Sequence, residues 1–162
     1  MQTKEAIRFA LAASNGAVLS VIDEMSGAPT TFPTSNGGCH PLWVLGHLTF
    51  VEGMIPEALF GEPNAVTGWA QYFGQNTEPV SDPAAYPPLA EIREKYTQLR
   101  ARNLQLLDAL SESDLDKPSV APPKGLEREF ATYGRSFLAL ALHQMSHRSH
   151  VTDARRAARV TV

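Results

Sequence analysis

"LALALHQMSHRSHVTDARRA", residues 138–157, places His143, His147 and His150 four and then three positions apart within an apolar run. Each residue of a helix turns the chain by about 100°, so the three imidazoles fall within about 60° of one another and form one stripe. We therefore predict a long helix over about residues 132–159, with the histidines facing the interior. Its inward line reads Ser136, Ala139, Leu140, His143, Ser146, His147, His150, Val151 and Ala154.

Three earlier segments also repeat apolar side chains at helical spacing. The first predicted helix spans residues 3–25 and is closed by Gly27 and Pro29. The second spans about residues 41–61, and the third spans residues 89–111. The inward line of the second helix reads His40, Trp43, Val44, His47, Val51, Met54 and Ala58, and that of the third reads Leu89, Ile92, Tyr96, Leu99, Leu106 and Leu110.

Connections rich in Pro, Gly, Ser and Asn separate these helices, over residues 27–38, 62–88 and 111–130. Within the second helix, Pro56 predicts a kink or an early end. The connection over 62–88 is long enough to cross from one end of a bundle to the other, so the third helix can run parallel to the second. The sequence thus predicts an all-α four-helix bundle with up-down-down-up topology.

The composition is that of one folded, mildly acidic domain covering residues 1–162. Hydrophobic residues make up 43% of the chain and charged residues 19%, with a formal net charge of −3. Such a chain lacks the basic field that binds phosphate backbones, so we expect no nucleic-acid partner. Cys39 is the one cysteine, and we see no apolar run of the roughly 20 residues that a membrane span needs. We therefore expect no membrane partner and a cytoplasmic location.

Buried histidines require partners, because an unpaired ring costs free energy and charged neighbouring rings repel one another. A divalent cation resolves both problems, since an i, i+4 pair such as His143 and His147 presents two rings to one ion. His47 lies on the inward line of another helix and is the natural third ligand. The alternative is that all three are core histidines held by hydrogen bonds.

The stretch "HPLWVLGH", residues 40–47, and the pair in "HQMSHRSH", residues 143–150, resemble the DinB-like (DinB/YfiT-like) superfamily of metalloenzymes. The order of helices, the long crossover and the chain length are similar as well. The resemblance implies an up-down-down-up four-helix bundle, often dimeric, with a divalent metal on His47, His143 and His147. Three imidazoles suit several ions, Cu among them; we expect Zn or Ni, with Fe and Mn as alternatives.

Several polar residues are candidates for roles around the metal. His150 stands where many members of the family have glutamine, and we predict that it lies just outside the ligands, with a fourth ligand as the alternative. Asn15 and Asn103 fall on the apolar faces of the first and third helices. They are candidates for orienting a substrate or a metal-bound water, or else are satisfied within the core. We expect His40 to be a polar residue at the start of its helix, with a metal ligand as the alternative.

Three neutral imidazoles leave a coordination position open, as catalytic metal sites do. Gln144 follows His143 where zinc peptidases carry a catalytic glutamate, so we do not expect a peptidase. The resemblance implies two activities: transfer of low-molecular-weight thiols such as bacillithiol or mycothiol to electrophiles, and metal-dependent hydrolysis. We predict thiol transfer to a small-molecule substrate, with a metal-held thiolate or water as the reacting group. The alternative is a non-catalytic, stress-linked binding or scaffold protein that keeps the metal.

The predicted last helix carries a second apolar line nearly opposite its histidines. A helix that is apolar on two sides is deeply buried or pairs with another chain, so this line predicts a homodimer. It consists of Leu138, Ala141, Leu142 and Met145.

Other side chains allow two interpretations each. Trp69, Tyr72 and Phe73 in the long connection either roof a pocket over the metal or anchor the connection to the bundle. Arg155 and Arg156 either form a solvated face or bind an anionic substrate. We interpret Cys39 as a small residue at the end of a loop.

Overall fold

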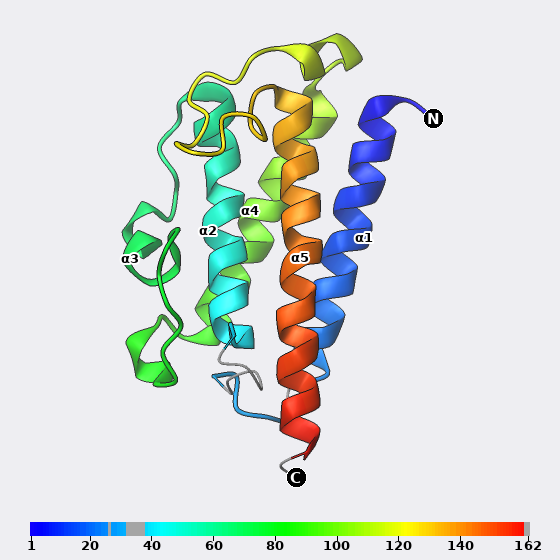
Figure 1. Cartoon of the computed structure of the whole chain (residues 1–162). Helices are drawn as coiled ribbons and strands as arrows, with labels where there is room; N and C mark the ends of the chain where they lie inside the picture. Colours follow the sequence, from blue (N-terminus) through cyan, green and yellow to red (C-terminus); the bar gives the residue numbers. More distant parts are fainter. Residues whose placement is uncertain (26, 32–37, 161–162) are drawn as a thin grey trace.

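The computed structural model describes residues 1–25, 27–31 and 38–160. Helices account for all the regular elements of these residues, so the predicted all-α class is confirmed. In Figure 1 the four long helices lie side by side, with α1 and α5 running in one direction and α2 and α4 in the other. Their bounds are Thr3–Asp23 for α1, Pro41–Phe60 for α2, Leu89–Ala109 for α4 and Tyr133–Val160 for α5. The short elements are η1 (Thr67–Trp69), α3 (Ala70–Phe73), η2 (Pro83–Ala85) and η3 (Glu112–Asp116).

Helix α2 begins and ends where local chemistry requires. The ring of His40 accepts a hydrogen bond from the backbone N–H of Trp43 and so caps the helix, as expected for a polar residue at this position. Gly61 ends the helix in the left-handed region at φ 72°. The helix runs through Pro56 to Phe60, so the predicted early end at Pro56 is wrong.

Two other predicted helix ends differ from the structure. Helix α1 ends at Asp23 rather than at residue 25, and α4 ends at Ala109 rather than at residue 111. The connection predicted over residues 27–38 includes residues 32–37, which lie outside the described part of the chain.

The core consists of two apolar clusters with buried polar side chains between them. On α5, Phe137 and Leu140 belong to one cluster and Val151 and Ala154 to the other, and the fully buried Gln144 lies between them. We call the buried polar set the polar layer; it consists of Ser14, Glu52, Arg100, Asn103, Gln144 and the hydroxyl of Tyr96.

Two residues of α5 lie on the opposite side from the one predicted. Ser146 was expected on the inward line but is exposed, and its hydroxyl donates to the carbonyl of His143 in its own helix. Ala141 was expected on the outward line but is 3% exposed and belongs to the core. The outward apolar side of α5 is therefore reduced to Leu138, Leu142 and Met145, which are 42%, 64% and 45% exposed.

The expectation that no segment is long and apolar enough to span a membrane is wrong for α1. Among the described residues, this helix alone meets that criterion of length and composition. A core helix of a soluble protein meets the same criterion, and α1 packs its buried side against α5 in this structure.

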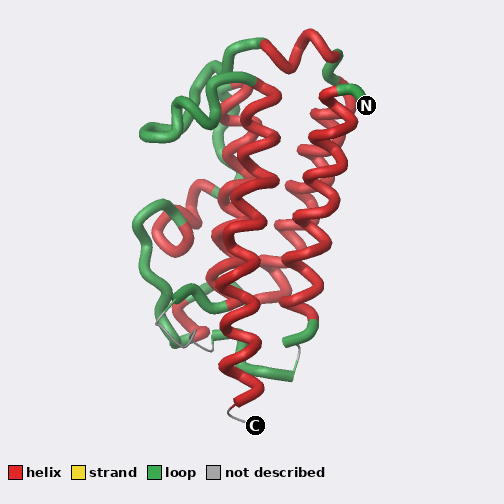
Figure 2. Tube along the Cα trace, turned by 45° about the vertical axis from the view of Figure 1, so that its right-hand side comes forward, coloured by secondary structure: helices red, strands yellow, loops and turns green. Residues whose placement is uncertain are grey.

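The two longest connections lie outside the bundle of long helices. Figure 2 shows the segment between α2 and α4 looping out along one side of the long helices, with the short helix α3 within it. Hydrogen bonds from Ser119 to Ala131 and from Tyr133 to Lys117 hold the ends of the second connection together before α5 begins. Leu126, Glu129 and Phe130 of this connection and Gln75 after α3 line the same space as His47 of α2 and His143 of α5.

Candidate metal centre

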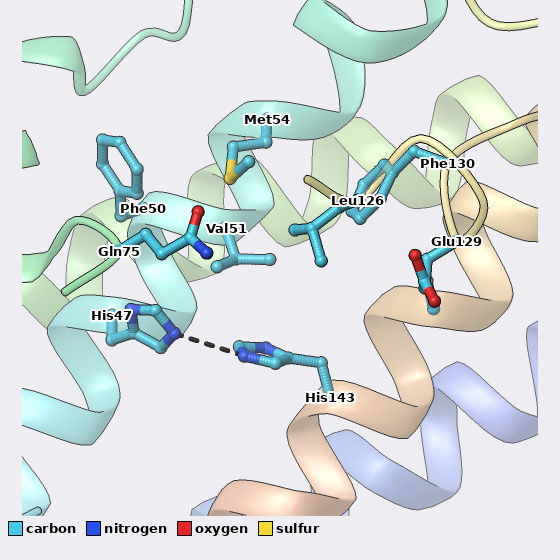
Figure 3. A pocket seen from close by; sticks show the side chains of 10 residues that line it. His47, Phe50, Val51, Met54, Gln75, Leu126, Glu129, Phe130 and His143 are labelled. Atoms are coloured by element: carbon cyan, nitrogen blue, oxygen red, sulfur yellow. Dashed lines mark hydrogen bonds between the residues drawn. The ribbon is translucent and has the colours of Figure 1, made fainter. Parts of the chain in front are cut away.

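Three histidine rings from two helices meet between α2 and α5. His47 comes from α2, whereas His143 and His147 come from successive turns of α5. The Nε2 atom of His143 lies 3.2 Å from Nε2 of His47 and 3.1 Å from Nε2 of His147. Figure 3 shows His47 and His143 pointing toward each other. The structure therefore brings together the three residues predicted as ligands.

Hydrogen bonds between the three rings cannot satisfy all three of their Nε2 atoms. Nδ1 of His47 lies 2.7 Å from the carbonyl oxygen of Phe73, which can only accept, so this nitrogen carries the proton and Nε2 of the neutral ring has a free lone pair. Nε2 of His143 can donate to that lone pair or accept from His147, but one ring nitrogen cannot do both. A cation at the convergence point would pair with a lone pair from each ring.

The spacing of the nitrogens fits such a cation. Bonds of about 2.0–2.1 Å in tetrahedral geometry hold neighbouring ligand nitrogens about 3.3–3.4 Å apart. The observed distances of 3.1 and 3.2 Å are close to this spacing, and all three ligand atoms lie within 4.8 Å of one another. The donor set is thus compatible with a divalent metal ion.

Burial favours the neutral, metal-binding form of each ring. It lowers the pKa of His143 to about 4, with a smaller contribution from the charge of His47. It lowers the pKa of His147 to about 3, and the neighbouring histidines add to the effect. Burial also lowers the pKa of His47, against the opposing influence of its hydrogen bond to Phe73. Burial thus favours, at neutral pH, the uncharged rings that can bind a cation.

Contacts with α3 fix the position of the His47 ring. Trp43, one turn earlier on α2, stacks on that ring with centroids 4.7 Å apart and planes 9° from parallel. The indole N–H of Trp43 donates to the carbonyl of Tyr72, next to the Phe73 carbonyl that accepts from His47. Gly46 permits this close approach, because a Cβ at that position would lie 2.2 Å from the ring of Phe73.

His143 and His147 are oriented differently. Their Nδ1 atoms are buried and have no hydrogen-bond partner among the described residues. Metal-binding histidines usually donate this N–H to a carboxylate or carbonyl, as His47 does. The packing of α5 and the neighbouring rings, including Trp43 at 6.2 Å from His147, therefore determine how these two rings point.

A cavity of about 290 Å³ lies beside His47 and His143. Figure 3 shows its walls, which come from α2, from α5 and from the connections that precede α4 and α5. Besides the two histidines, it is lined by Phe50, Val51, Met54, Gln75, Leu126, Glu129, Phe130 and Ala139. Two of the three converging rings thus face a space large enough for a small molecule.

The other predicted site residues lie at different distances from this centre. The ring of His150 is 5.4 Å from that of His147, outside the group of three converging nitrogens. Asn15 accepts a hydrogen bond of 2.6 Å from the hydroxyl of Tyr96. Asn103 donates to the carbonyl and the carboxylate of Glu52 at 2.9 and 2.7 Å. These contacts connect both asparagines with the polar layer rather than with the histidines.

The polar layer was not predicted from the sequence, apart from Asn103. Gln144 donates to the carboxylate of Glu52 at 3.1 Å and to the hydroxyl of Tyr96 at 2.9 Å. It also accepts from the hydroxyl of Ser14 at 2.7 Å, so one α5 side chain is bound to α1, α2 and α4. Because Gln144 directly follows His143, these bonds fix the rotation of α5 that points His143 at His47.

An ion pair completes the layer. Glu52 and Arg100 are 3.0 Å apart and almost fully buried. Burial raises the pKa of the Glu52 carboxyl, and the nearby charge of Arg100 and the hydrogen bond from Asn103 oppose that rise. Burial likewise raises the pKa of Tyr96 to about 12. A sequence signal existed, since Glu52 and Arg100 are charged residues on apolar helix faces.

The aromatic residues of the long connection anchor it to α2. Phe73 is fully buried and stacks on Tyr86, while Trp69 packs against Phe73 edge to face. None of the three predicted aromatic residues lines the cavity beside the histidines, whereas Gln75 does. Of the two interpretations of these residues, the structure favours anchoring.

The arginines of the last helix also differ in their contacts. Arg155 forms an ion pair with Glu24 near the end of α1, and Arg156 is exposed. Arg155 therefore contributes to the contact between α1 and α5, consistent with a surface role.

Comparison with known proteins identifies the family but not the reaction. The profile of the DinB superfamily matches residues 10–151, a stretch that contains all three converging histidines. A search of curated proteins gives no match. The chain belongs to the DinB superfamily.

Proposed function

We propose that this protein is a metal-dependent enzyme that transfers a low-molecular-weight thiol to small electrophiles. His47, His143 and His147 would hold the ion. One observation carries the proposal. Three uncharged imidazole rings bring their Nε2 atoms together beside a cavity of about 290 Å³, and hydrogen bonds between the rings cannot satisfy all three nitrogens. A site closed on all sides would instead suggest a structural metal.

The three imidazoles bind several divalent ions, of which we expect two. Three imidazole nitrogens suit Zn²⁺ or Ni²⁺, with Fe²⁺ and Mn²⁺ as alternatives. When bound, such an ion supplies Lewis acidity, which lowers the pKa of a coordinated thiol or water. The chain's own contribution is to keep the three rings neutral by burial and to fix His47 between Trp43 and the carbonyl of Phe73.

In the proposed reaction, a sulfur–carbon bond forms between the thiol and the electrophile. With an aryl chloride, the carbon–chlorine bond breaks, chloride leaves with the bonding electrons, and the thiol proton passes to solvent. The apolar walls of the cavity would hold the electrophile and exclude water. Metal-dependent hydrolysis is the related reaction, in which water replaces the thiol.

The test combines metal analysis with turnover. Freshly purified protein should contain about one equivalent of a divalent metal, and a His143→Ala variant should contain far less. The loaded protein should accelerate the reaction of a thiol with 1-chloro-2,4-dinitrobenzene at least about 100-fold over the variant, the scale of losing a metal ligand or its support. Ser146→Ala, on an exposed position of the same helix, is the matched control and should behave as the original protein.

Two results would reject the proposal. Absence of metal from all preparations, and no binding of added Zn²⁺ or Ni²⁺, would leave hydrogen-bonded core histidines. Full metal loading with equal turnover in the original protein and in His143→Ala would favour a non-catalytic metal-binding or scaffold protein for this chemistry.

We further infer a single DinB-like domain over residues 1–162 with up-down-down-up topology. The directions of the four long helices in Figure 1 and their packing along α5 and α2 support this inference. A homodimer through the exposed side of α5, a small-molecule partner and a cytoplasmic location remain part of the proposal. The exposed Leu138 and Leu142 support the first, and the free Cys39 is consistent with the last.

A further inference from the structure

The volume and the lining of the cavity beside the histidines limit which molecules it can bind. Its volume of about 290 Å³ is about twice the roughly 150 Å³ that accommodates a benzene molecule. Phe50, Val51 and Met54 form the α2 side, and Leu126 and Phe130 face them from the connection before α5 (Figure 3). This size and lining suit one substituted aromatic ring or a short alkyl chain.

The walls are held in place without a ligand. The N–H of Phe130 donates to the carbonyl of Leu126 at 2.9 Å, which closes a turn on the wall itself. The N–H of Ala121 donates to the carbonyl of Ala58 at 3.0 Å and ties the middle of this connection to α2. A preformed pocket loses little conformational entropy when it binds a ligand.

Apart from its histidines, the lining of the cavity carries negative charge only. Apart from the two histidines, Glu129 is the one ionisable residue among the ten that line the cavity, and neither lysine nor arginine is among them. The carboxylate of Glu129 stands on the wall opposite His47 in Figure 3. At the end of the cavity away from the histidines, an anionic group would find no basic side chain among the lining and would meet this carboxylate, whereas an uncharged or cationic group would not be penalised.

We propose that this cavity binds the electrophilic substrate and that the substrate is an apolar aromatic or alkyl compound, neutral or positively charged. Its reactive end lies against His47 and His143, and its apolar body lies between Met54 and Phe130. The assignment of the reactive end rests on the proposed function.

The test uses protein without metal, so that it does not depend on the metal site. The chain contains four methionines, Met1, Met25, Met54 and Met145, and Met54 lines the cavity. Methyl-¹³C-methionine protein is titrated with three probes of similar size: 4-phenylbutanol, 4-phenylbutylamine and 4-phenylbutyrate. The Met54 methyl resonance should shift saturably with the alcohol and the amine, while the resonances of Met25 and Met145 stay in place.

Charge selectivity gives the second readout. The amine should bind about tenfold more tightly than the carboxylate, the size expected from two exposed charge interactions of opposite sign. Glu129→Lys should reverse that order, and Glu78→Lys, an exposed position on the other connection, should leave it unchanged. Ala139→Phe should fill the cavity and abolish the Met54 shift, whereas Ala101→Phe on the exposed side of α4 should not.

The outcomes separate this proposal from the proposed function. Equal binding of all three probes, or a shift at Met145 without one at Met54, overturns the substrate assignment even if the metal is present. Selective shifts at Met54 in a protein that binds no metal support the cavity assignment and reject only the metal-dependent reaction.

Discussion

The Nδ1–H of His47 donates to the backbone carbonyl of Phe73 at 2.7 Å, and this bond determines which nitrogen of the ring faces the other two histidines. Phe73 lies in α3, inside the long connection, so a segment far from α5 in the sequence fixes the tautomer of a proposed metal ligand. An outer hydrogen bond of this kind orients the ring and raises its basicity. The long connection is therefore part of the proposed site, although none of its aromatic rings lines the cavity.

Gly46→Ala should weaken metal binding without touching a ligand. The new Cβ would lie 2.2 Å from the Phe73 ring, which must move and take its carbonyl away from His47. We expect a loss of about 10–100-fold in affinity for Zn²⁺, the scale known for outer partners of metal ligands. Competition with a chelator of known affinity measures it.

Gly53→Ala is the matched control for that change. It is one of the α2 glycines, and its new Cβ would lie 2.0 Å from the side chain of Asn64 rather than from α3. This variant should lose stability yet keep its affinity for Zn²⁺. If both variants lost affinity equally, the effect would come from general loosening of α2 and not from Phe73.

Metal removal should lower the thermal stability of the folded protein. A ligand present at about 100 times its dissociation constant stabilises the native state by about 2.7 kcal/mol. For a chain of this size, that corresponds to a melting temperature about 5–10 °C higher with Zn²⁺ than after chelation. Differential scanning calorimetry should show this difference in the original protein and in Ser146→Ala, and no difference in His147→Ala.

Arg100→Met should destabilise the fold strongly. Glu52 is fully buried, and without its partner at 3.0 Å its carboxylate must either stay charged and unpaired or take up a proton; losing one partner of a buried pair typically costs about 3–5 kcal/mol. Denaturant unfolding measures the loss. The double variant Glu52→Gln/Arg100→Met should recover much of it, because no unpaired charge is left in the core. A double variant as unstable as Arg100→Met alone would show that shape, not charge, dominates at this position.

The periodicity of apolar residues predicted α1, α4 and α5, because each of these helices buries one side. Helix α2 is buried on almost all sides, and its prediction depended on Pro41 at its start and Gly61 at its end. The same reasoning failed at Ser146 and Ala141, since a regular stripe drawn through the histidines takes no account of which neighbouring helix covers each position. Proline at position 56 lies late in a helix that tertiary packing preserves, so its usual effect was overridden.

The three histidines could be predicted as one group because two of them are neighbours on α5 and the third lies on another inward line. The contacts within the polar layer could not be predicted. Glu52 and Arg100 are 48 positions apart, and nothing local in the chain shows that Gln144 bonds to both Glu52 and Tyr96. The cavity was equally hidden, because Leu126 and Phe130 reach it from an irregular connection whose path depends on distant hydrogen bonds.

The exposed side of α5 predicts a homodimer in solution. Leu142 is 64% exposed between Leu138 and Met145, and burying such side chains against a second copy would favour association. Leu142→Glu should therefore yield monomers in analytical ultracentrifugation at concentrations where the original protein sediments as a dimer. Phe9→Glu changes an exposed apolar residue of α1 and is the control, which should remain dimeric. An original protein that is monomeric throughout would contradict the interface.

His40 should make the start of α2 sensitive to acid. Its Nδ1 accepts from the N–H of Trp43 at 3.0 Å, and its Nε2–H donates to the carbonyl of Val80 at 2.9 Å, so the neutral ring joins the helix cap to the long connection. Burial lowers the pKa of His40 below its ordinary value of 6.5. The unfolded chain therefore takes up this proton more readily than the folded one. The contribution of His40 to stability is complete above pH 6.5 and declines as the pH falls through the lowered value.

A protonated Nδ1 would face the Trp43 N–H as a second donor and remove a cap worth about 1 kcal/mol. In His40→Asn, which keeps a capping oxygen without a titrating ring, urea unfolding between pH 7 and 4 should show a smaller loss of stability than the original protein; an equal loss in both would exclude His40 as a source of the acid sensitivity.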